Sequence, residues 1–530
     1  AVLFGPTLVG CGDTEPAPAP AKPVEIADAE GKSTSLNCPG SAGCENGGGD
    51  LLVGAAAKKI TPTIETWTDT NANGVWDMGE PYEDANKNGK WDGVWLAGFG
   101  MGRAATGVHD DAWARAVTFE QGDVSVGMVS LDCVGFFQQW VIDIRQAAKA
   151  AGLDFDHVLV SSTHVHEMQD TVGQWGANAS NSGVNPAYME YIIAQAVESL
   201  KAAKGAQKTA QMVVAQGQRP DLISDHRPPE VLDQNINMMQ FQDDTGAPLA
   251  NVVIWGNHPE ALGSDNQLLT SDYPHYLRET LEAKWPAAPA VFFNGPLGGL
   301  TTTIGILGCP DAMGKETCPQ GTFERAEYVG KGAAEAAIAA LESAKAIKEA
   351  APKLEFRRRP FLVPPTNVTL ALGVISGLIV RDIYWADGRK VTDEERPGIN
   401  VSLISSGEVV VATEINMLNI GPASIAGIPG EFYTELWLEK PGGGSFVEKP
   451  EGADYPDAVA ETPIQSMLPQ GSVKMIINNA NDFLGYIIPL PQWDLVAPWT
   501  YGDQQYGEEN SSGHETAPII ASEFAKMAGK

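Results

Sequence analysis

Residues 157–167 read His157-Val158-Leu159-Val160-Ser161-Ser162-Thr163-His164-Val165-His166-Glu167, a short apolar run followed at once by a pair of histidines. The run from His157 to Ser161 predicts a buried β-strand. In α/β proteins, ligands gather beyond the carboxyl ends of strands, and neutral imidazoles are common zinc ligands. The segment therefore favours an α/β fold with a metal site at this strand end. Two hydrogen-bonded histidines without a metal are the alternative.

Strand and helix signals alternate on both sides of this segment. The sequence predicts strands at Ser125–Asp132, Val252–Trp255 and Ala290–Phe293, and helices at Trp140–Ala151, Tyr188–Lys204, Tyr276–Lys284 and Glu324–Glu349. From Val368 onward the pattern turns to strands and Gly/Pro loops. The predicted fold class is α/β, a mixed β-sheet core flanked by helices, in one large domain over residues 51–530.

Two further strand ends carry polar residues into loops. The strand Val252–Trp255 is followed by Gly256-Asn257-His258, and the strand Ala290–Phe293 by Asn294. Because strand ends in such sheets share one edge, these loops predict a pocket that contains His258. A buried loop histidine without a ligand is the alternative for His258.

Composition narrows the range of functions. The 530 residues are 43% hydrophobic, enough for a large core. With 35 Lys and Arg against 67 Asp and Glu, the net charge of −32 disfavours nucleic acid as a partner. No apolar run approaches the ~20 residues that span a bilayer. The run Leu370 to Val380 is predicted to be buried core, or alternatively to line the entrance of a pocket. The absence of a Gly-x-Ser-x-Gly motif disfavours a serine hydrolase.

The N-terminal residues 1–50 are predicted to be a lipoprotein signal remnant and a Pro/Gly-rich tether. The apolar start ends Leu8-Val9-Gly10-Cys11, which predicts lipidation of Cys11. A Pro-rich segment follows, of the kind that spaces a domain from a membrane. We therefore expect an exported protein that contacts a membrane through a lipid anchor, as an outer-membrane or cell-surface lipoprotein, or a periplasmic or extracellular protein.

The remaining cysteines fit an oxidising compartment. Cys38 and Cys44, and likewise Cys309 and Cys318, each enclose a short loop and can form a disulfide. A four-cysteine metal site is the weaker alternative, because no Cys-x-x-Cys pair is present. Cys133 stands in an apolar stretch and is predicted to be a buried free thiol.

A doubled motif between residues 65 and 95 predicts a calcium-binding insertion. Both copies place oxygen-bearing side chains at positions 1, 3, 5 and 9 around a Gly at position 6, as in EF-hand loops. The first copy also has a Glu at position 12, where the second has Trp95, so one or two structural Ca²⁺ ions are expected. The predicted ligands are Asp69, Asn71, Asn73, Val75 through its carbonyl, Asp77 and Glu80, then Asp84, Asn86, Asn88, Lys90 and Asp92.

Seven motifs in order give the chain a resemblance to the neutral ceramidase family, over its amidase domain. They are Val53-Gly54-Ala55 to Ile60-Thr61-Pro62; Gly107-Val108-His109 leading to Ala114-Arg115-Ala116; Ser162 to His166; Trp255 to His258; Pro429-Gly430-Glu431-Phe432; Asn478 to Asn481 leading to Gly485-Tyr486; and Gln505-Tyr506-Gly507. The resemblance implies a zinc hydrolase domain at 51–530, into which residues 65–95 are inserted.

The resemblance also implies a catalytic site. It assigns one Zn²⁺ to His164, His258, Glu431 and Tyr486, a set of nitrogen and oxygen donors that suits zinc. It places His166 in the same cavity, to shuttle a proton or to hydrogen-bond the substrate carbonyl. Tyr486 would also stabilise the oxyanion. His109 would contact either the substrate or the residues that bind the metal.

Two departures from the family bear on the substrate. The family's catalytic Ser is missing from the loop Asn294–Leu300, which has Gly or Leu at that place, and Thr301 to Thr303 follow it. The motifs also run to the end of the sequence, so we expect the amidase domain without the family's C-terminal β-sandwich. We expect hydrolysis of an amide in an N-acyl or lipid-like substrate by metal-activated water. The alternatives are a zinc esterase or lactonase, and a calcium-stabilised surface lipoprotein that only binds.

Overall fold

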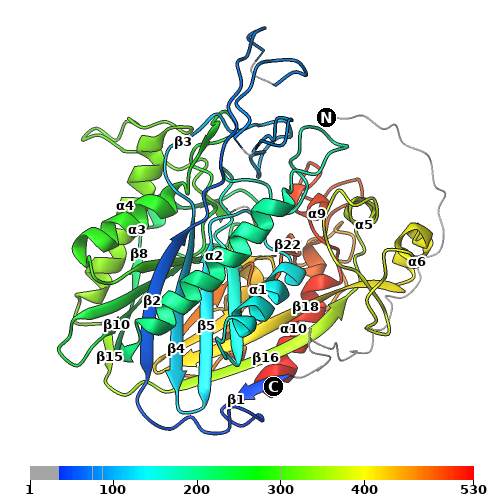
Figure 1. The fold of residues 1–530 in the computed structure, drawn as a ribbon. Helices are drawn as coiled ribbons and strands as arrows, with labels where there is room; N and C mark the ends of the chain where they lie inside the picture. The colour runs from blue at the N-terminus through cyan, green and yellow to red at the C-terminus, as the bar shows by residue number, and fades with distance from the viewer. Residues whose placement is uncertain (1–34, 74–75, 86, 300) are drawn as a thin grey trace.

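Three β-sheets with helices on their outer faces make up the fold (Figure 1). The computed structural model describes residues 35–530 apart from 74–75, 86 and 300. The mixed sheets and flanking helices confirm the predicted α/β class. Within these residues, no helix combines the length and apolar character needed to cross a bilayer.

The first sheet carries the histidine pair. Its order is β6-β5-β4-β2-β7, with β5 and β6 parallel and the other pairs antiparallel. Two helices cover its outer face, and buried side chains at helical spacing, such as Val141, Ile144 and Ala148, face the sheet. The elements are β2 Leu52–Lys59, β4 Trp113–Gln121, β5 Val124–Leu131, α1 Gln138–Ala150, β6 His157–Ser162, α2 Pro186–Gly205 and β7 Lys208–Thr209.

The second sheet carries the other two predicted strand ends. Its order is β13-β11-β10-β8-β15, and β11 and β13 run parallel, so their carboxyl ends meet at one edge. Helices α3 and α4 cover this sheet. The elements are β8 Gln211–Gln218, β10 Asn235–Gln242, β11 Pro248–Trp255, α3 Tyr273–Lys284, β13 Ala290–Asn294, α4 Phe323–Leu341 and β15 Ile347–Glu349.

The third sheet and the C-terminal elements close the molecule. The sheet order is β1-β16-β18-β19-β21, with β17 also pairing β18. Its elements are β1 Leu36–Cys38, β16 Leu354–Val363, β17 Tyr384–Trp385, β18 Val409–Ile420, β19 Ala423–Gly427 and β21 Val473–Ile477. The helices of this region are α5 Val368–Ile375, α6 Val401–Ser405, α7 Thr434–Trp437, α8 Ile464–Met467, α9 Tyr506–Glu509 and α10 Thr516–Ala528.

Short strand pairs tie loops to the sheets near the site. They are β3 Gly107–Val108 with β12 Leu268–Leu269, β9 Ser224–Asp225 with β14 Thr301–Thr302, and β20 Glu431–Phe432 with β22 Tyr486–Ile487.

One apolar core lies between the three sheets. Phe119 of β4, Phe241 of β10 and Phe356 of β16 all belong to it and are almost fully buried. Fully burying such side chains contributes about 1.5–3 kcal/mol each. The sheets are therefore held against each other, and the loops at their ends keep fixed relative positions.

Several sequence predictions need correction. The helix predicted over Glu324–Glu349 ends at Leu341, and its last residues form β15. The predicted tether extends too far, because Leu36–Cys38 pairs with β16. The C-terminal α10 was not predicted. Both predicted disulfides are present, Cys38–Cys44 and Cys309–Cys318, and Cys133 is free and buried.

Candidate metal centre

The loops after β6, β11 and β13 meet at one place. The side chain of Asn294 bridges them: its Nδ2 donates to the carbonyl of Thr163 at 2.8 Å, and its Oδ1 accepts from Asn257 N at 3.1 Å. The loop after β21 is attached to β6, because Asn481 N donates to Val160 O and Val160 N donates to Asn481 Oδ1. His164 and His258, far apart in sequence, are thereby brought together.

Four of the predicted ligands converge on one point. Glu431 Oε2 lies 3.2 Å from His258 Nε2 and 3.4 Å from His164 Nε2. Tyr486 Oη lies 3.4 Å from His258 Nε2. Glu431 and Tyr486 are register partners in the β20–β22 pair, which explains how residues 55 positions apart reach the same point.

Backbone carbonyls orient both histidines. His164 Nδ1 lies 2.6 Å from Val134 O, and His258 Nδ1 lies 2.6 Å from Thr301 O. Since a carbonyl only accepts, each Nδ1 carries the proton and each Nε2 offers a lone pair to the centre. This is the usual arrangement behind metal-bound histidines.

The geometry fits a zinc ion. A tetrahedron with bonds of about 2.0–2.1 Å has edges of about 3.3–3.4 Å between its donor atoms. Three donor separations, from Glu431 to His164, from Glu431 to His258 and from Tyr486 to His258, are 3.2–3.4 Å and agree with those edges. Two neutral imidazoles, one carboxylate and one phenol also form a donor set that suits zinc.

Electrostatics keep the carboxylate ionised. Burial alone would raise the pKa of Glu431, but the neighbouring His164 and His258 lower it to about 2. Burial, together with the charge of Glu431, raises the pKa of Tyr486 well above its ordinary value, so the phenol is protonated. The centre thus offers a cation one full negative charge.

His166 lies beside these ligands with different partners. Its ligand nitrogen is within 4.8 Å of those of His164 and His258, so a three-histidine set is also geometrically available. Its Nδ1 faces Glu260 Oε2 at 3.4 Å. Burial lowers the pKa of His166 well below its ordinary value, and His164 and His258 lower it further.

His109 does not join the centre. Its ring stacks on Phe323 with centroids 3.7 Å apart, and its Nδ1 lies 2.9 Å from Asp110 Oδ2. Asp110 also accepts from Ser271 N and from Thr270 Oγ1. The structure therefore gives His109 a partly exposed place beside α4, and its predicted substrate contact remains a prediction.

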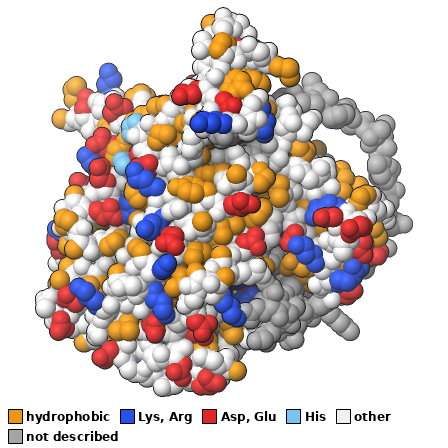
Figure 2. Space-filling view, in the orientation of Figure 1, with side chains coloured by type: hydrophobic (Ala, Val, Ile, Leu, Met, Phe, Trp, Pro, Cys, Tyr) orange, Lys and Arg blue, Asp and Glu red, His pale blue; other side chains and the backbone are white. Residues whose placement is uncertain are grey.

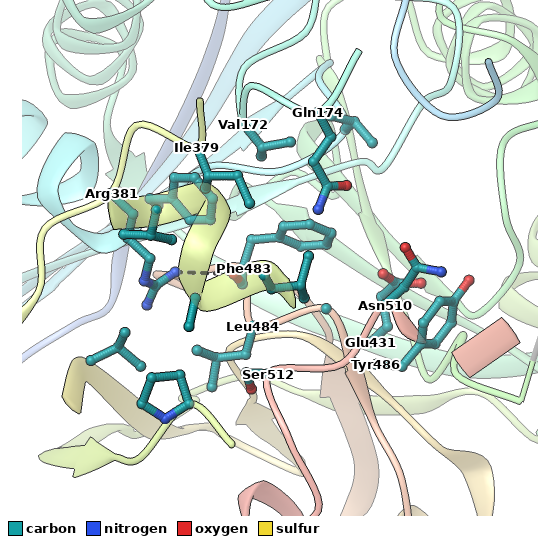
Figure 3. A pocket seen from close by; sticks show the side chains of 18 of the residues that line it. Val172, Gln174, Ile379, Arg381, Glu431, Phe483, Leu484, Tyr486, Asn510 and Ser512 are labelled. Carbon is teal, nitrogen blue, oxygen red and sulfur yellow. Dashed lines mark hydrogen bonds between the residues drawn. The ribbon is translucent and has the colours of Figure 1, made fainter. Parts of the chain in front are cut away.

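An apolar pocket leads to the metal centre (Figure 3). At its polar end, Glu431, Tyr486 and Asn510 lie close together in the view. Its walls are largely aliphatic and aromatic, with α5 on one side and Phe483 and Leu484 on another. The aliphatic and aromatic wall residues are Val134, Phe137, Val172, Trp175, Leu370, Ala371, Val374, Ile375, Ile379, Ile383, Ile404, Val409, Val411, Phe483 and Leu484.

In the loop after β13, a side chain would be crowded at Gly298 and strained at Gly299. A Cβ at Gly298 would lie 2.4 Å from the Tyr433 ring and 2.6 Å from Glu431 O. Gly299 has a φ of +80°, where a side chain is strained. Thr301 to Thr303 are buried, and the Thr302 hydroxyl donates to Glu260. The loop backbone thus serves as packing behind Glu431.

Sequence reasoning missed Glu260, Tyr506 as a pocket residue, and Asn510. The signal for Glu260 was available, since it stands two residues after His258 in the same strand-end loop. Tyr506 and Asn510 line the pocket from the segment that begins with α9. Nothing in the local pattern around Asn510 indicates this position, which depends on how the C-terminal segment folds back.

The insertion projects from the top of the molecule in Figure 1. Stacked Trp76 and Trp91, with centroids 4.7 Å apart, form its small core. In the first loop the amides of Asn71 and Asn73 each donate to Asp77 Oδ2 at 2.7 Å, while Glu80 accepts from the backbone of Thr70 and Asp77.

The second calcium loop shows the same convergence of polar groups. Asn88 N donates to Asp84 Oδ1, and Asp92 accepts from Asn88 Nδ2 and pairs with Lys90. Val75, Asn86 and Cys11 lie outside the described residues. Calcium binding remains a prediction for both loops.

Comparison with known proteins gives one partial sequence match. No family model matches the chain. A curated relative, "Neutral ceramidase A" of Dictyostelium discoideum, is 25% identical over 209 residues, which are 35% of this chain and 29% of that protein. The alignment thus spans less than a third of the relative's length.

Solved structures share the fold. The crystal structure of neutral ceramidase from Pseudomonas aeruginosa has a TM-score of 0.62 at 15% identity, over 90% of this chain and 74% of that one. A ceramidase described as complexed with C2 has a TM-score of 0.61 at 15% identity, over 90% and 75%. The chain therefore has the fold of the neutral ceramidase structures and a partial sequence similarity to a neutral ceramidase.

Proposed function

We propose that this protein is a zinc-dependent hydrolase that cleaves an amide bond in an N-acyl or lipid-like substrate. The observation that carries the proposal is the convergence of His164, His258, Glu431 and Tyr486 at the end of an apolar pocket. A bound zinc ion supplies a polarised carbonyl and an activated water molecule.

The pocket supports a substrate with a long apolar part. Most of the side chains that line it away from the metal centre are aliphatic or aromatic, and such walls favour a hydrocarbon chain. The relatives are named as ceramidases, which are lipid amide hydrolases, and this supports the same bond type here. The acyl chain is proposed to lie along α5.

The roles of the side chains follow from their positions. Tyr486, a protonated phenol facing the centre, can donate a hydrogen bond to a developing oxyanion. His166 lines the pocket beside the ligands, within reach of the leaving nitrogen, and is proposed to carry its proton. Both groups are largely buried and line the pocket.

Esterase or lactonase activity is the second candidate. The loop Asn294–Leu300 has no Ser, so one oxyanion donor of the family is missing. Loss of a comparable donor costs about 10²–10³ in turnover. Amides, with poor leaving groups, suffer most from such a loss, and activated esters or lactones least.

The test combines metal analysis with a substrate panel of N-acyl amides, esters and lactones of matched acyl length. We expect turnover by the zinc-loaded protein, its loss after zinc removal, and its return when zinc is added back. If the protein binds zinc and the acyl compounds but turns none of them over, the alternative of a surface lipoprotein that only binds would replace this proposal.

Export, the lipid anchor at Cys11 and calcium binding by the insertion are proposed as parts of the same account. Two disulfides support an oxidising compartment. Mass spectrometry of native protein should find an acylated Cys11, and an unmodified peptide across this position would exclude the anchor.

Figure 2 shows acidic and basic side chains interspersed, without a basic patch on the face drawn.

A further inference from the structure

A buried carboxylate, Glu260, lies beside His166. Its Oε2 lies 3.4 Å from His166 Nδ1, and its Oε1 accepts a hydrogen bond from Thr302 Oγ1. Glu260 is 8% exposed, and His166 7%. Nδ1 of His166 makes no hydrogen bond to the described residues, so the carboxylate is the group that faces it.

The backbone holds both residues in one frame. His166 N donates to Pro259 O at 3.2 Å, and Glu260 N donates to His258 O at 3.0 Å. Thr302 is a bridge partner of His258 in the backbone, and its hydroxyl also accepts from Ile304 N. The carboxylate therefore keeps a fixed place relative to His166 and to the ligand His258.

Packing restricts the His166 ring to one plane. Gly98 presses against it, since a Cβ there would lie 2.2 Å from His166 Cγ. Phe99 contacts the ring edge-on, with centroids 5.1 Å apart. Two features of the ring are then still undetermined. One is its flip, which exchanges Nδ1 with Cδ2, and the other is its tautomer. Steric contacts cannot decide between these states, but a carboxylate can.

We propose that Glu260, held by Thr302, is a positioning residue for His166. Its carboxylate accepts a hydrogen bond from His166 Nδ1, which fixes the ring flip, places the proton on Nδ1 and leaves the Nε2 lone pair for the pocket. Carboxylates behind functional histidines act in this way in other sites. The kinetic consequence rests on the proposed function, whereas the state of the ring does not.

The first test reads the ring itself, without any substrate. Ring-¹⁵N histidine spectra of the zinc-loaded protein should show His166 in the Nδ1–H tautomer, with its signals assigned by their loss in His166→Ala. In Glu260→Ala the signals should shift towards the Nε2–H form or split between states. Glu230→Ala, an exposed control, should change nothing. An Nε2–H tautomer in the wild type, or an unchanged spectrum in Glu260→Ala, overturns the proposal.

The second test separates positioning from general damage. Glu260→Ala should keep its zinc and its KM while kcat falls about 10–100-fold. Glu260→Gln, whose carbonyl can still accept from Nδ1, should recover part of the loss, and Thr302→Val should be intermediate. On a His166→Ala background, Glu260→Ala should cost nothing further. An additive loss, or loss of zinc, contradicts the proposal. If no substrate is turned over at all, the proposed function fails and the spectra still decide this inference.

Discussion

His164 adopts a backbone conformation that is unusual for a residue with a side chain. Its φ is +65°, in the left-handed region, and its N donates to Cys133 O. Such strain costs of order 1–3 kcal/mol and persists where the surroundings impose it. Here it turns the chain sharply after Thr163, so that His164 and His166 both face His258. The motif predicted these residues, but the strained turn follows from tertiary contacts.

The buried carboxyl of Glu435, also a single residue, predicts how the stability of the protein depends on pH. Glu435 is 1% exposed on α7, and one of its oxygens has no hydrogen-bond partner in the described part of the chain. Burial and the nearby Asp225 raise its pKa to about 8. Its ordinary pKa is 4.5. Between these values the folded state binds one more proton than the unfolded state. The free energy of unfolding should therefore fall as pH rises from about 4.5 to about 8.

Glu435→Gln removes this dependence. Relative to wild type, the variant should gain stability between pH 5 and pH 8, by an amount of order 1–4 kcal/mol. Denaturant unfolding at several pH values measures the gain, with the exposed Glu230→Gln as a control that should track wild type. A constant difference between variant and wild type across this range would show that Glu435 does not titrate in it.

At the scale of elements, α5 links the surface to the pocket. The sequence predicted the run Leu370 to Val380 mainly as buried core, but it forms a short surface helix and the turn after it. Ala371 and Val374 line the pocket, while Leu372 is 45% exposed. Apolar composition alone could not distinguish core from pocket wall, because both bury the same surface.

A substitution on each face of α5 tests its role. Ala371→Trp should fill the pocket and lower kcat/KM for long acyl chains at least about 10-fold relative to short ones, because one indole occupies the space of several methylenes. Leu372→Trp, one residue on and facing solvent, should leave both unchanged. Equal effects of Ala371→Trp on short and long chains would exclude α5 as the acyl wall.

The insertion carries a separate prediction about calcium. Adding Ca²⁺ to metal-stripped protein should raise the Tm by mass action, because the ion would bind the oxygen-bearing side chains of the first loop in the folded state. Asp69→Ala should abolish the rise, whereas Asp311→Ala, which alters an Asp-centred turn in another exposed loop, should keep it. A rise that survives in Asp69→Ala would assign calcium elsewhere.

At the scale of the whole molecule, the sequence predicted what depends on local periodicity. The strand ends of β6, β11 and β13 and the helices between them lie within a few residues of their predicted places. It did not predict that three sheets share one core. That arrangement depends on pairings such as β1 with β16 and β19 with β21, which join distant segments and leave no periodic signal. Glu431 and Tyr486 were identified through family motifs, since two-residue strands are too short to be predicted locally.

Zinc content is the most direct measurement of the central claim, that His164, His258, Glu431 and Tyr486 hold a zinc ion. Wild-type protein dialysed against low free zinc should retain about one ion per chain. His164→Ala, His258→Ala and Glu431→Ala should retain almost none, while His166→Ala should remain fully loaded, because His166 turns to Glu260 instead. A wild type that binds no zinc, or a His166→Ala variant as depleted as His164→Ala, would contradict the account.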